Sequence, residues 1–194
     1  MKKTVLDINI RIEEIRKALT NKMYLSAISL ALTVPDICGR MENTTGDDKE
    51  KYIQWVDKYV TPKYFPQPYI DENDNFQQSE KRAFTGTRCY GLRCAVLHSG
   101  NEDLSRNHMD LDDESGIAPA NKVYRIYLFD DPEHEIVYST GSKTNESVEI
   151  DFFLNIHKFC ERICEGAKKT IEQFGETDAI EKYSIEVLEY GRSL

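Results

Sequence analysis

The sequence predicts a mainly α-helical bundle with a small β element, a β-hairpin or edge sheet, in its C-terminal half. Apolar residues recur at three- and four-residue spacing along most of the chain, which is typical of amphipathic helices. The stretch from about 123 to 139 is instead rich in β-branched and aromatic residues. Because 194 residues with 40% hydrophobic content can bury a real core, we expect one domain over residues 1–194.

Two helical segments are expected at the start of the chain. Residues 4–19 place apolar side chains on one face with charges between them, so a first helix is expected there. Residues 22–40 are more apolar all round and should form the most buried helix. Pro35 interrupts this second segment, and the pattern of residues 33–36 is able to cap a helix. The second helix therefore either restarts at this point or runs through with a kink.

A third helix is predicted from a cap at Asp47 or Asp48 to just before Pro62. The segment 62–69 then interleaves proline with aromatic residues, and 71–75 is a polar loop. Those aromatic side chains either stack on nucleic-acid bases or lie over the edge of the core. Their acidic surroundings favour the core.

The next predicted helix, from Ser79 to Gly100, is the segment in which we expect the functional residues. It contains an Arg-x4-His hexapeptide, from Arg93 to His98. At about 100° per residue these two side chains point about 140° apart, so one straight helix does not present both to a small target. A site completed by a second chain is therefore expected. The helix also carries the concentrated basic stretch Lys81, Arg82, Arg88 and Arg93. This stretch is either a solvated face or a phosphate-binding surface.

Residues 101–147 are expected to form a loop and β-hairpin insertion before the last helix. The loop 101–121 is acidic, but an EF-hand register that begins at Asp110 lacks the required glycine and glutamate, so no metal site is predicted. The segments 123–129 and 135–139 have strand character and flank turn residues. They should therefore pair with each other.

A long last helix is predicted over residues 148–174, where apolar residues keep helical spacing. His157 falls on its apolar stripe and is expected to be a hydrogen-bonded core histidine rather than a ligand or catalyst. The pair Cys160 and Cys164 should likewise pack in the core rather than bind zinc. The tail 179–190 is either a short helix or a strand beside the hairpin, and its alternation favours the strand.

Composition limits the partners and the compartment. The 34 acidic residues outnumber the 25 basic ones, and a formal net charge of -9 repels nucleic acid, so any RNA binding has to be local. Five cysteines without the spacing of a disulfide scaffold fit a reducing compartment. Early charged residues argue against a secretory signal, and the apolar runs are too short for a membrane span. A cytoplasmic protein with no membrane association is therefore expected.

The hexapeptide near the end of a helix, in a chain built from amphipathic helices, resembles the HEPN superfamily (higher eukaryotes and prokaryotes nucleotide-binding). The phrase from Tyr90 to Gly100 looks like the form seen in uncharacterised bacterial members. The resemblance covers mainly residues 4–100 and 148–174. It implies an antiparallel helical bundle that forms a homodimer. Many members are metal-independent ribonucleases, which implies here an endoribonuclease of the toxin–antitoxin or phage-defence type.

The resemblance also implies roles for particular residues. Arg93 would stabilise charge on a phosphate, and His98 would act as general acid or base on the ribose 2′-hydroxyl, in one composite site formed by two protomers. Apart from the resemblance, the basic stretch makes Lys81, Arg82 and Arg88 the candidate substrate-binding residues. No cofactor and no metal are implied, and the expected partners are a second copy of the chain, RNA or a nucleotide, and an antitoxin-like protein.

Two other interpretations stay open. One is a non-catalytic HEPN-like module that binds a nucleotide, RNA or a protein. Cys94 favours it, because nuclease members usually carry a polar residue directly after the motif arginine, and so does the negative net charge. The other treats the hexapeptide as a coincidence within a helical interaction domain.

Overall fold

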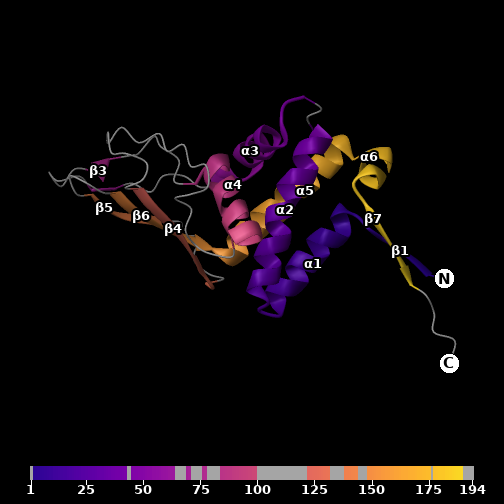
Figure 1. Cartoon of the computed structure of the whole chain (residues 1–194), viewed down its shortest axis with the longest axis horizontal. Coiled ribbons are helices and arrows are strands. Elements are labelled where there is room, and N and C mark those ends of the chain that lie inside the picture. The colour runs from indigo at the N-terminus through magenta and orange to yellow at the C-terminus, as the bar shows by residue number, and fades with distance from the viewer. Residues whose placement is uncertain are drawn as a thin grey trace.

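The computed structural model shows a bundle of helices with a sheet at one end and a two-stranded ribbon at the other (Figure 1). It describes residues 2–42, 45–63, 69–70, 76–77, 84–99, 122–131, 138–143, 148–175 and 177–189. The predicted polar loop 71–75 and acidic loop 101–121 lie outside the described residues, as do Lys81 and Arg82.

The bundle is organised around its second helix. The described helices are α1 Ile8–Thr20, α2 Tyr24–Glu42, α3 Asp48–Tyr59, α4 Gly86–Cys94, α5 Ile156–Phe174 and α6 Thr177–Lys182, with a π-helical turn Ala95–Ser99 after α4 and a short 3-10 turn Thr61–Lys63 after α3. Helices α1, α3 and α5 all pack against α2. The predicted fold class, a helical bundle with a small sheet, is confirmed. None of the described helices is long and apolar enough to cross a membrane.

Side chains at the helix starts explain where the helices begin. Asp7 caps α1, and its carboxylate accepts the backbone N–H of Ile10 at 2.9 Å. The first helix therefore begins at Ile8, and the prediction that it starts at residue 4 is wrong, because residues 2–6 form a strand. The predicted cap of the third helix is confirmed at Asp47, which forms a capping box with Glu50.

Helix α2 continues through Pro35 rather than restarting there. The hydroxyl of Thr33 does not cap a new helix. It donates to the carbonyl of Leu30 at 2.7 Å and accepts a hydrogen bond from Arg11 Nη1 at 2.7 Å. The alternative left open by the sequence is thus settled in favour of one continuous helix.

The sheet has a different strand order from the one predicted. Strand β6, Val148–Asn155, lies between β4, Lys122–Phe129, and β5, Tyr138–Lys143. It runs parallel to β4 and antiparallel to β5. Residues 135–137 lie outside the described part of the chain. The predicted pairing with 123–129 is wrong for Tyr138 and Ser139, because they pair with β6, and the hairpin is formed by β5 and β6. A second, two-residue pair joins β2, Tyr69–Ile70, to β3, Phe76–Gln77.

The last long helix is shorter than predicted. It begins at Ile156 after the cap Asn155, and residues 148–155 form a strand instead. Within that strand Val148 and Ile150 alternate with Glu149 and Asp151, a period of two that fits a strand better than a helix. The helical prediction failed because the apolar residues of 148–155 fit both the helical spacing of three to four residues and the strand spacing of two over so short a segment.

The C-terminal tail forms both predicted elements. After α6, strand β7, Ile185–Glu189, pairs antiparallel with β1, Lys2–Leu6. The predicted strand is confirmed, but its partner is the N-terminal strand and not the hairpin. This ribbon lies at the far end of the bundle from β4, β5 and β6 (Figure 1).

Close helix packing in the core depends on small residues. The predicted core position of Cys160 and Cys164 is confirmed, since both are 0% exposed. At Gly166 of α5, an added Cβ would lie 2.9 Å from Trp55 Cη2 and 2.9 Å from Tyr59 Cβ. Such distances are too short for carbon atoms, so α5 approaches α3 closely only because this residue has no side chain.

We expect Gly166→Ala to lower the free energy of unfolding by about 1–3 kcal/mol, because the methyl group overfills the contact between α3 and α5. Urea denaturation measures this loss. Lys169→Ala, an exposed change on the same helix, is the matched control and should alter stability by less than about 0.5 kcal/mol. Equal stability of Gly166→Ala and the parent would contradict the close approach of these helices.

Candidate functional site

The helix that carries the Arg-x4-His hexapeptide begins at Gly86 and not at Ser79 as predicted. Thr85 caps it by accepting the N–H of Arg88, and the N–H of Gly86 donates to Asp57 Oδ1 at 2.8 Å. An added Cβ at Gly86 would lie 2.4 Å from the carbonyl oxygen of Ile53. The start of α4 is therefore pressed against α3, which fixes the direction in which the helix leaves.

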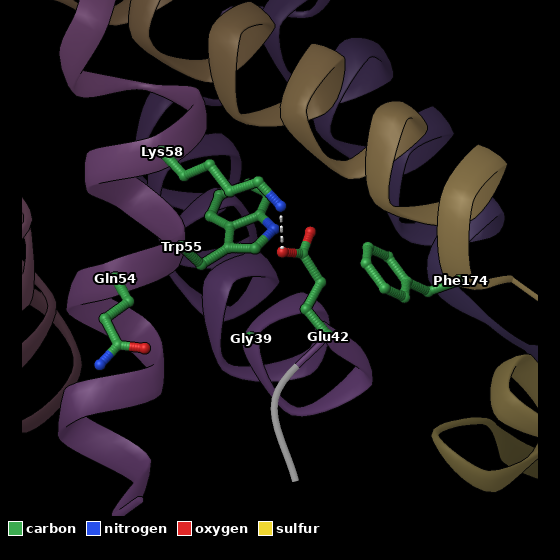
Figure 2. Close-up of a pocket in the computed structure, with 6 residues that line it drawn as sticks. All are labelled: Gly39, Glu42, Gln54, Trp55, Lys58 and Phe174. Atoms are coloured by element: carbon green, nitrogen blue, oxygen red, sulfur yellow. Dashed lines mark hydrogen bonds and ion pairs between the residues drawn. The ribbon is translucent and has the colours of Figure 1, made fainter. Parts of the chain in front are cut away.

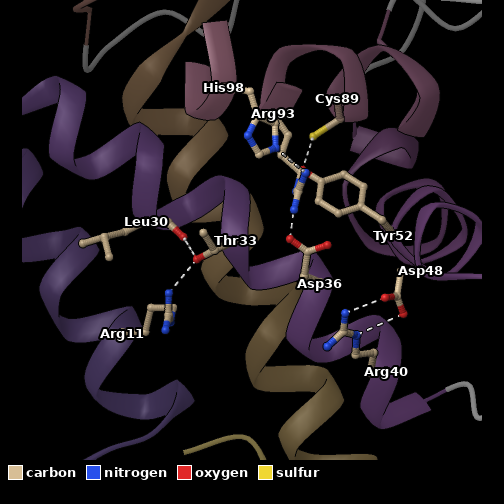
Figure 3. A network of polar contacts seen from close by, with 10 residues as sticks. All are labelled: Arg11, Leu30, Thr33, Asp36, Arg40, Asp48, Tyr52, Cys89, Arg93 and His98. Atoms are coloured by element: carbon tan, nitrogen blue, oxygen red, sulfur yellow. Dashed lines mark hydrogen bonds and ion pairs between the residues drawn. The ribbon is translucent and has the colours of Figure 1, made fainter. Parts of the chain in front are cut away.

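The hexapeptide spans a change of helix type. Arg93 lies in the last turn of α4, and His98 lies in the π-helical turn Ala95–Ser99. A π-helix closes i to i+5 hydrogen bonds, so residues five apart come to lie nearly above one another. Arg93 Nη1 accordingly approaches His98 Nε2 to 3.5 Å (Figure 3). The predicted separation of the two side chains is wrong, because it assumed an α-helix throughout.

Arg93 is held in place by Asp36, which comes from the middle of α2. Arg93 Nε donates to Asp36 Oδ2 at 2.8 Å, and the two side chains are 20% and 22% exposed. Burial works to lower the pKa of Arg93, but the hydrogen bond and charge of Asp36 outweigh it and raise that pKa. The guanidinium is therefore a fixed, permanently charged group at the edge of the core.

Aromatic rings complete the support of this guanidinium. The centre of the Tyr90 ring lies 5.6 Å from Arg93 Cζ, and that of Tyr52 lies 5.9 Å away. Tyr52 is fully buried, and its hydroxyl lies 3.4 Å from Cys89 Sγ. The two tyrosine rings meet edge to face at 5.4 Å. The arginine thus lies on a packed layer shared by α3 and α4.

The other predicted site residues lie near the two ends of the motif helix or outside the described part of the chain. His98 is exposed at the end of the π-helical turn, so its imidazole is open to solvent. Arg88 lies half-buried in the first turn of α4, five residues before Arg93. Lys81 and Arg82, the remaining predicted substrate-binding residues, lie outside the described part of the chain. The structure therefore brings Arg93 and His98 together and adds Asp36, which the sequence presented only as part of a capping pattern.

A second polar cluster surrounds His157. His157 Nε2 lies 2.7 Å from Asp130 Oδ1, and the hydroxyl of Tyr24 donates to Asp130 Oδ2. These hydrogen bonds, from Tyr24 first and then from His157, lower the pKa of Asp130. The prediction of a hydrogen-bonded histidine is confirmed, but its side chain is 27% exposed rather than enclosed in the core. The cluster ties the end of β4 to the first turns of α2 and α5.

Within the described residues, no group of three or more His, Cys, Asp or Glu side chains is arranged to hold a metal ion. The chemistry that the Arg93 and His98 pair offers is a fixed cation beside an exposed imidazole. A cation of this kind stabilises an anionic phosphate, and an imidazole transfers protons near neutral pH.

No protein-family model, curated protein or solved structure matches this chain at a significant level.

We expect one of the five cysteines, Cys94, to react rapidly with Ellman's reagent at pH 8 in the folded protein. Cys94 is half-buried, whereas four thiols are buried: Cys38, Cys89, Cys160 and Cys164. Burial raises the pKa of Cys89 to about 12, so its reactive thiolate is scarce at pH 8. All five thiols should react in urea, and Cys94→Ser should remove the fast phase. A second fast thiol in the folded state would contradict this packing.

Proposed function

We propose that the protein is a HEPN-like, metal-independent endoribonuclease of the toxin or defence type, acting in the cytoplasm as a homodimer. The observation that carries this proposal is the 3.5 Å approach of Arg93 Nη1 to His98 Nε2, with Asp36 bound to the opposite edge of the guanidinium. The resemblance of the hexapeptide to the HEPN motif points the same way.

The proposed reaction uses the 2′-hydroxyl of the RNA itself as nucleophile. His98 accepts the 2′-hydroxyl proton while the 2′-oxygen forms a bond to phosphorus. The bond from phosphorus to the 5′-oxygen breaks, and that oxygen takes up a proton, leaving a 2′,3′-cyclic phosphate and a free 5′-hydroxyl. Arg93 stabilises the negative charge that builds up on the phosphate oxygens.

Asp36 acts in this scheme as a positioning residue. It accepts the hydrogen bond of Arg93 Nε and leaves Nη1 close to His98. Because Arg binds phosphate through a planar fork, holding one edge of the guanidinium fixes the orientation of the other.

A second copy of the chain supplies what one protomer lacks. The reaction needs a base and an acid at the same time, and a protomer offers one exposed motif histidine. Two protomers that meet at the π-helical turn bring two Arg93 and two His98 side chains into one composite site. The net charge of -9 makes a local cluster of arginines more important for RNA binding, and it also suits a basic protein partner of the antitoxin type.

A second candidate function is a non-catalytic module that binds a nucleotide, RNA or a protein. The ion pair with Asp36 favours it, because that carboxylate neutralises part of the charge that a phosphate would meet at Arg93. Cys94, in the place where a polar residue is usual in nuclease members, favours it as well. In this case Arg93 and His98 contact the ligand without turnover.

We expect His98→Ala to slow cleavage of a labelled single-stranded RNA about 10²–10⁴-fold, because the proton-transfer group is lost. Arg93→Ala should slow it about 10²–10³-fold through the lost stabilisation of charge. The assay contains EDTA, and circular dichroism confirms the fold of each variant. As a matched control, Arg40→Ala removes an arginine of α2 that pairs with a surface carboxylate, Asp48, and should keep full activity.

Absence of cleavage by the parent protein, or equal rates in the parent and both variants, would contradict the ribonuclease proposal. RNA binding that is retained without cleavage, and that weakens in Arg93→Ala, would select the binding module instead.

Mixing the two inactive variants tests the composite site. A mixed dimer of Arg93→Ala and His98→Ala still contains one arginine and one histidine of the motif, whereas each variant homodimer lacks one type completely. We expect part of the activity to return after the subunits are exchanged. Mixed dimers that are no faster than the two variant homodimers would contradict a site in which the arginine of one protomer works with the histidine of the other.

A further inference from the structure

A cavity of about 290 Å³ opens between the C-terminal ends of α2, α3 and α5, and it is built from different residues than the Arg93 and His98 site. Its lining is Gly39, Glu42, Gln54, Trp55, Lys58 and Phe174 (Figure 2). The volume lies at the lower limit for small-molecule pockets, so it suits a ligand of only a few heavy atoms.

A buried carboxylate lies at the inner side of this cavity. The side chain of Glu42 is only 7% exposed. Glu42 Oε1 accepts a hydrogen bond from the hydroxyl of Thr170 at 2.7 Å, and Thr170 accepts one from Trp55 Nε1 at 2.8 Å. These two hydrogen bonds fix the carboxylate and leave Oε2 free of them. A buried carboxylate needs a positive charge beside it, and Oε2 is the atom that a cation can approach.

The cation that fills this position in the structure is the side chain of Lys58. Its Nζ lies 2.7 Å from Glu42 Oε2, 4.6 Å from the ring centre of Tyr59 and 5.6 Å from that of Phe174. Burial works against the charge, but hydrogen bonds to Glu42 and Tyr59 keep the pKa of Lys58 above its usual value. An ammonium group beside one carboxylate and two aromatic rings has the contacts by which proteins recognise alkylammonium ions.

We propose that this cavity binds a small free alkylammonium ligand at Glu42, and that Lys58 is a built-in competitor that occupies the site when no ligand is present. The side chain of Lys58 is 51% exposed, so it can leave for solvent without disturbing the core. Phe174, at the end of α5, is 37% exposed and lines one side of the cavity. A ligand can enter past its ring. The proposal does not depend on the ribonuclease proposal.

The test uses Lys58→Ala, which removes the competitor and leaves the other lining residues unchanged. Trp55 is the single tryptophan of the chain, so its fluorescence reports directly on the cavity. We expect butylammonium and tetramethylammonium to change that fluorescence in Lys58→Ala at a dissociation constant at least tenfold lower than in the parent. Lys169→Ala, which removes an exposed lysine elsewhere, should bind like the parent.

Two further variants assign the binding to the proposed residues. Glu42→Gln added to Lys58→Ala should abolish binding, because it removes the charge and keeps a hydrogen-bonding oxygen for Thr170. Phe174→Ala in the same background should weaken binding, since one of the two aromatic rings near the ammonium group is lost. Thermal unfolding gives an independent readout: Lys58→Ala should melt below the parent, and butylammonium should restore part of the loss.

Equal binding by Lys58→Ala and the parent would overturn the proposal, and so would binding that survives Glu42→Gln. A parallel titration with a lysine capped at both ends separates a free amine from the side chain of a protein partner. We expect butylammonium to bind more tightly, and tighter binding of the capped lysine would overturn the assignment to a free ligand.

Discussion

The burial of α2 between α1, α3 and α5 is the constraint on which the rest of the structure depends. Its apolar face forms the centre of the core, and its polar residues lie where the neighbouring helices and the sheet meet it. Tyr24 at its start binds the end of β4, Asp36 in its middle holds Arg93, and Glu42 at its last position lies in the cavity. One helix thus places the anchoring acid of both proposed sites.

Both sites use an ion pair in which the carboxylate comes from α2. Arg93 is held between Asp36 and two tyrosine rings, and this lets the guanidinium keep its charge and its direction. Lys58 lies at the surface beside the more deeply buried Glu42, and its flexible side chain is able to leave. Arg93 is held more firmly than Lys58. We therefore assign Arg93 a fixed role at its site and treat Lys58 as displaceable.

Much of the helical bundle could be predicted from residue patterns. The burial of the second helix, the cap at Asp47 and the packing of Cys160 and Cys164 follow from spacing and residue type alone. The strand over residues 148–155 was missed because a short apolar run fits both periods, and the neighbouring strands that favour the extended form lie elsewhere in the sequence. The order of the sheet depends on the same distant pairing.

For the candidate site, the sequence by itself determined which chemical groups are present. They are an arginine and a histidine, five residues apart near the end of a predicted helix. Their contact was decided by the tertiary structure, because a π-helical turn after Cys94 rotates His98 toward Arg93. Asp36 is 57 residues away from Arg93, and no local pattern relates them. Local spacing governs helix formation and capping, whereas the direction of a side chain at a helix end depends on what the rest of the chain packs against it.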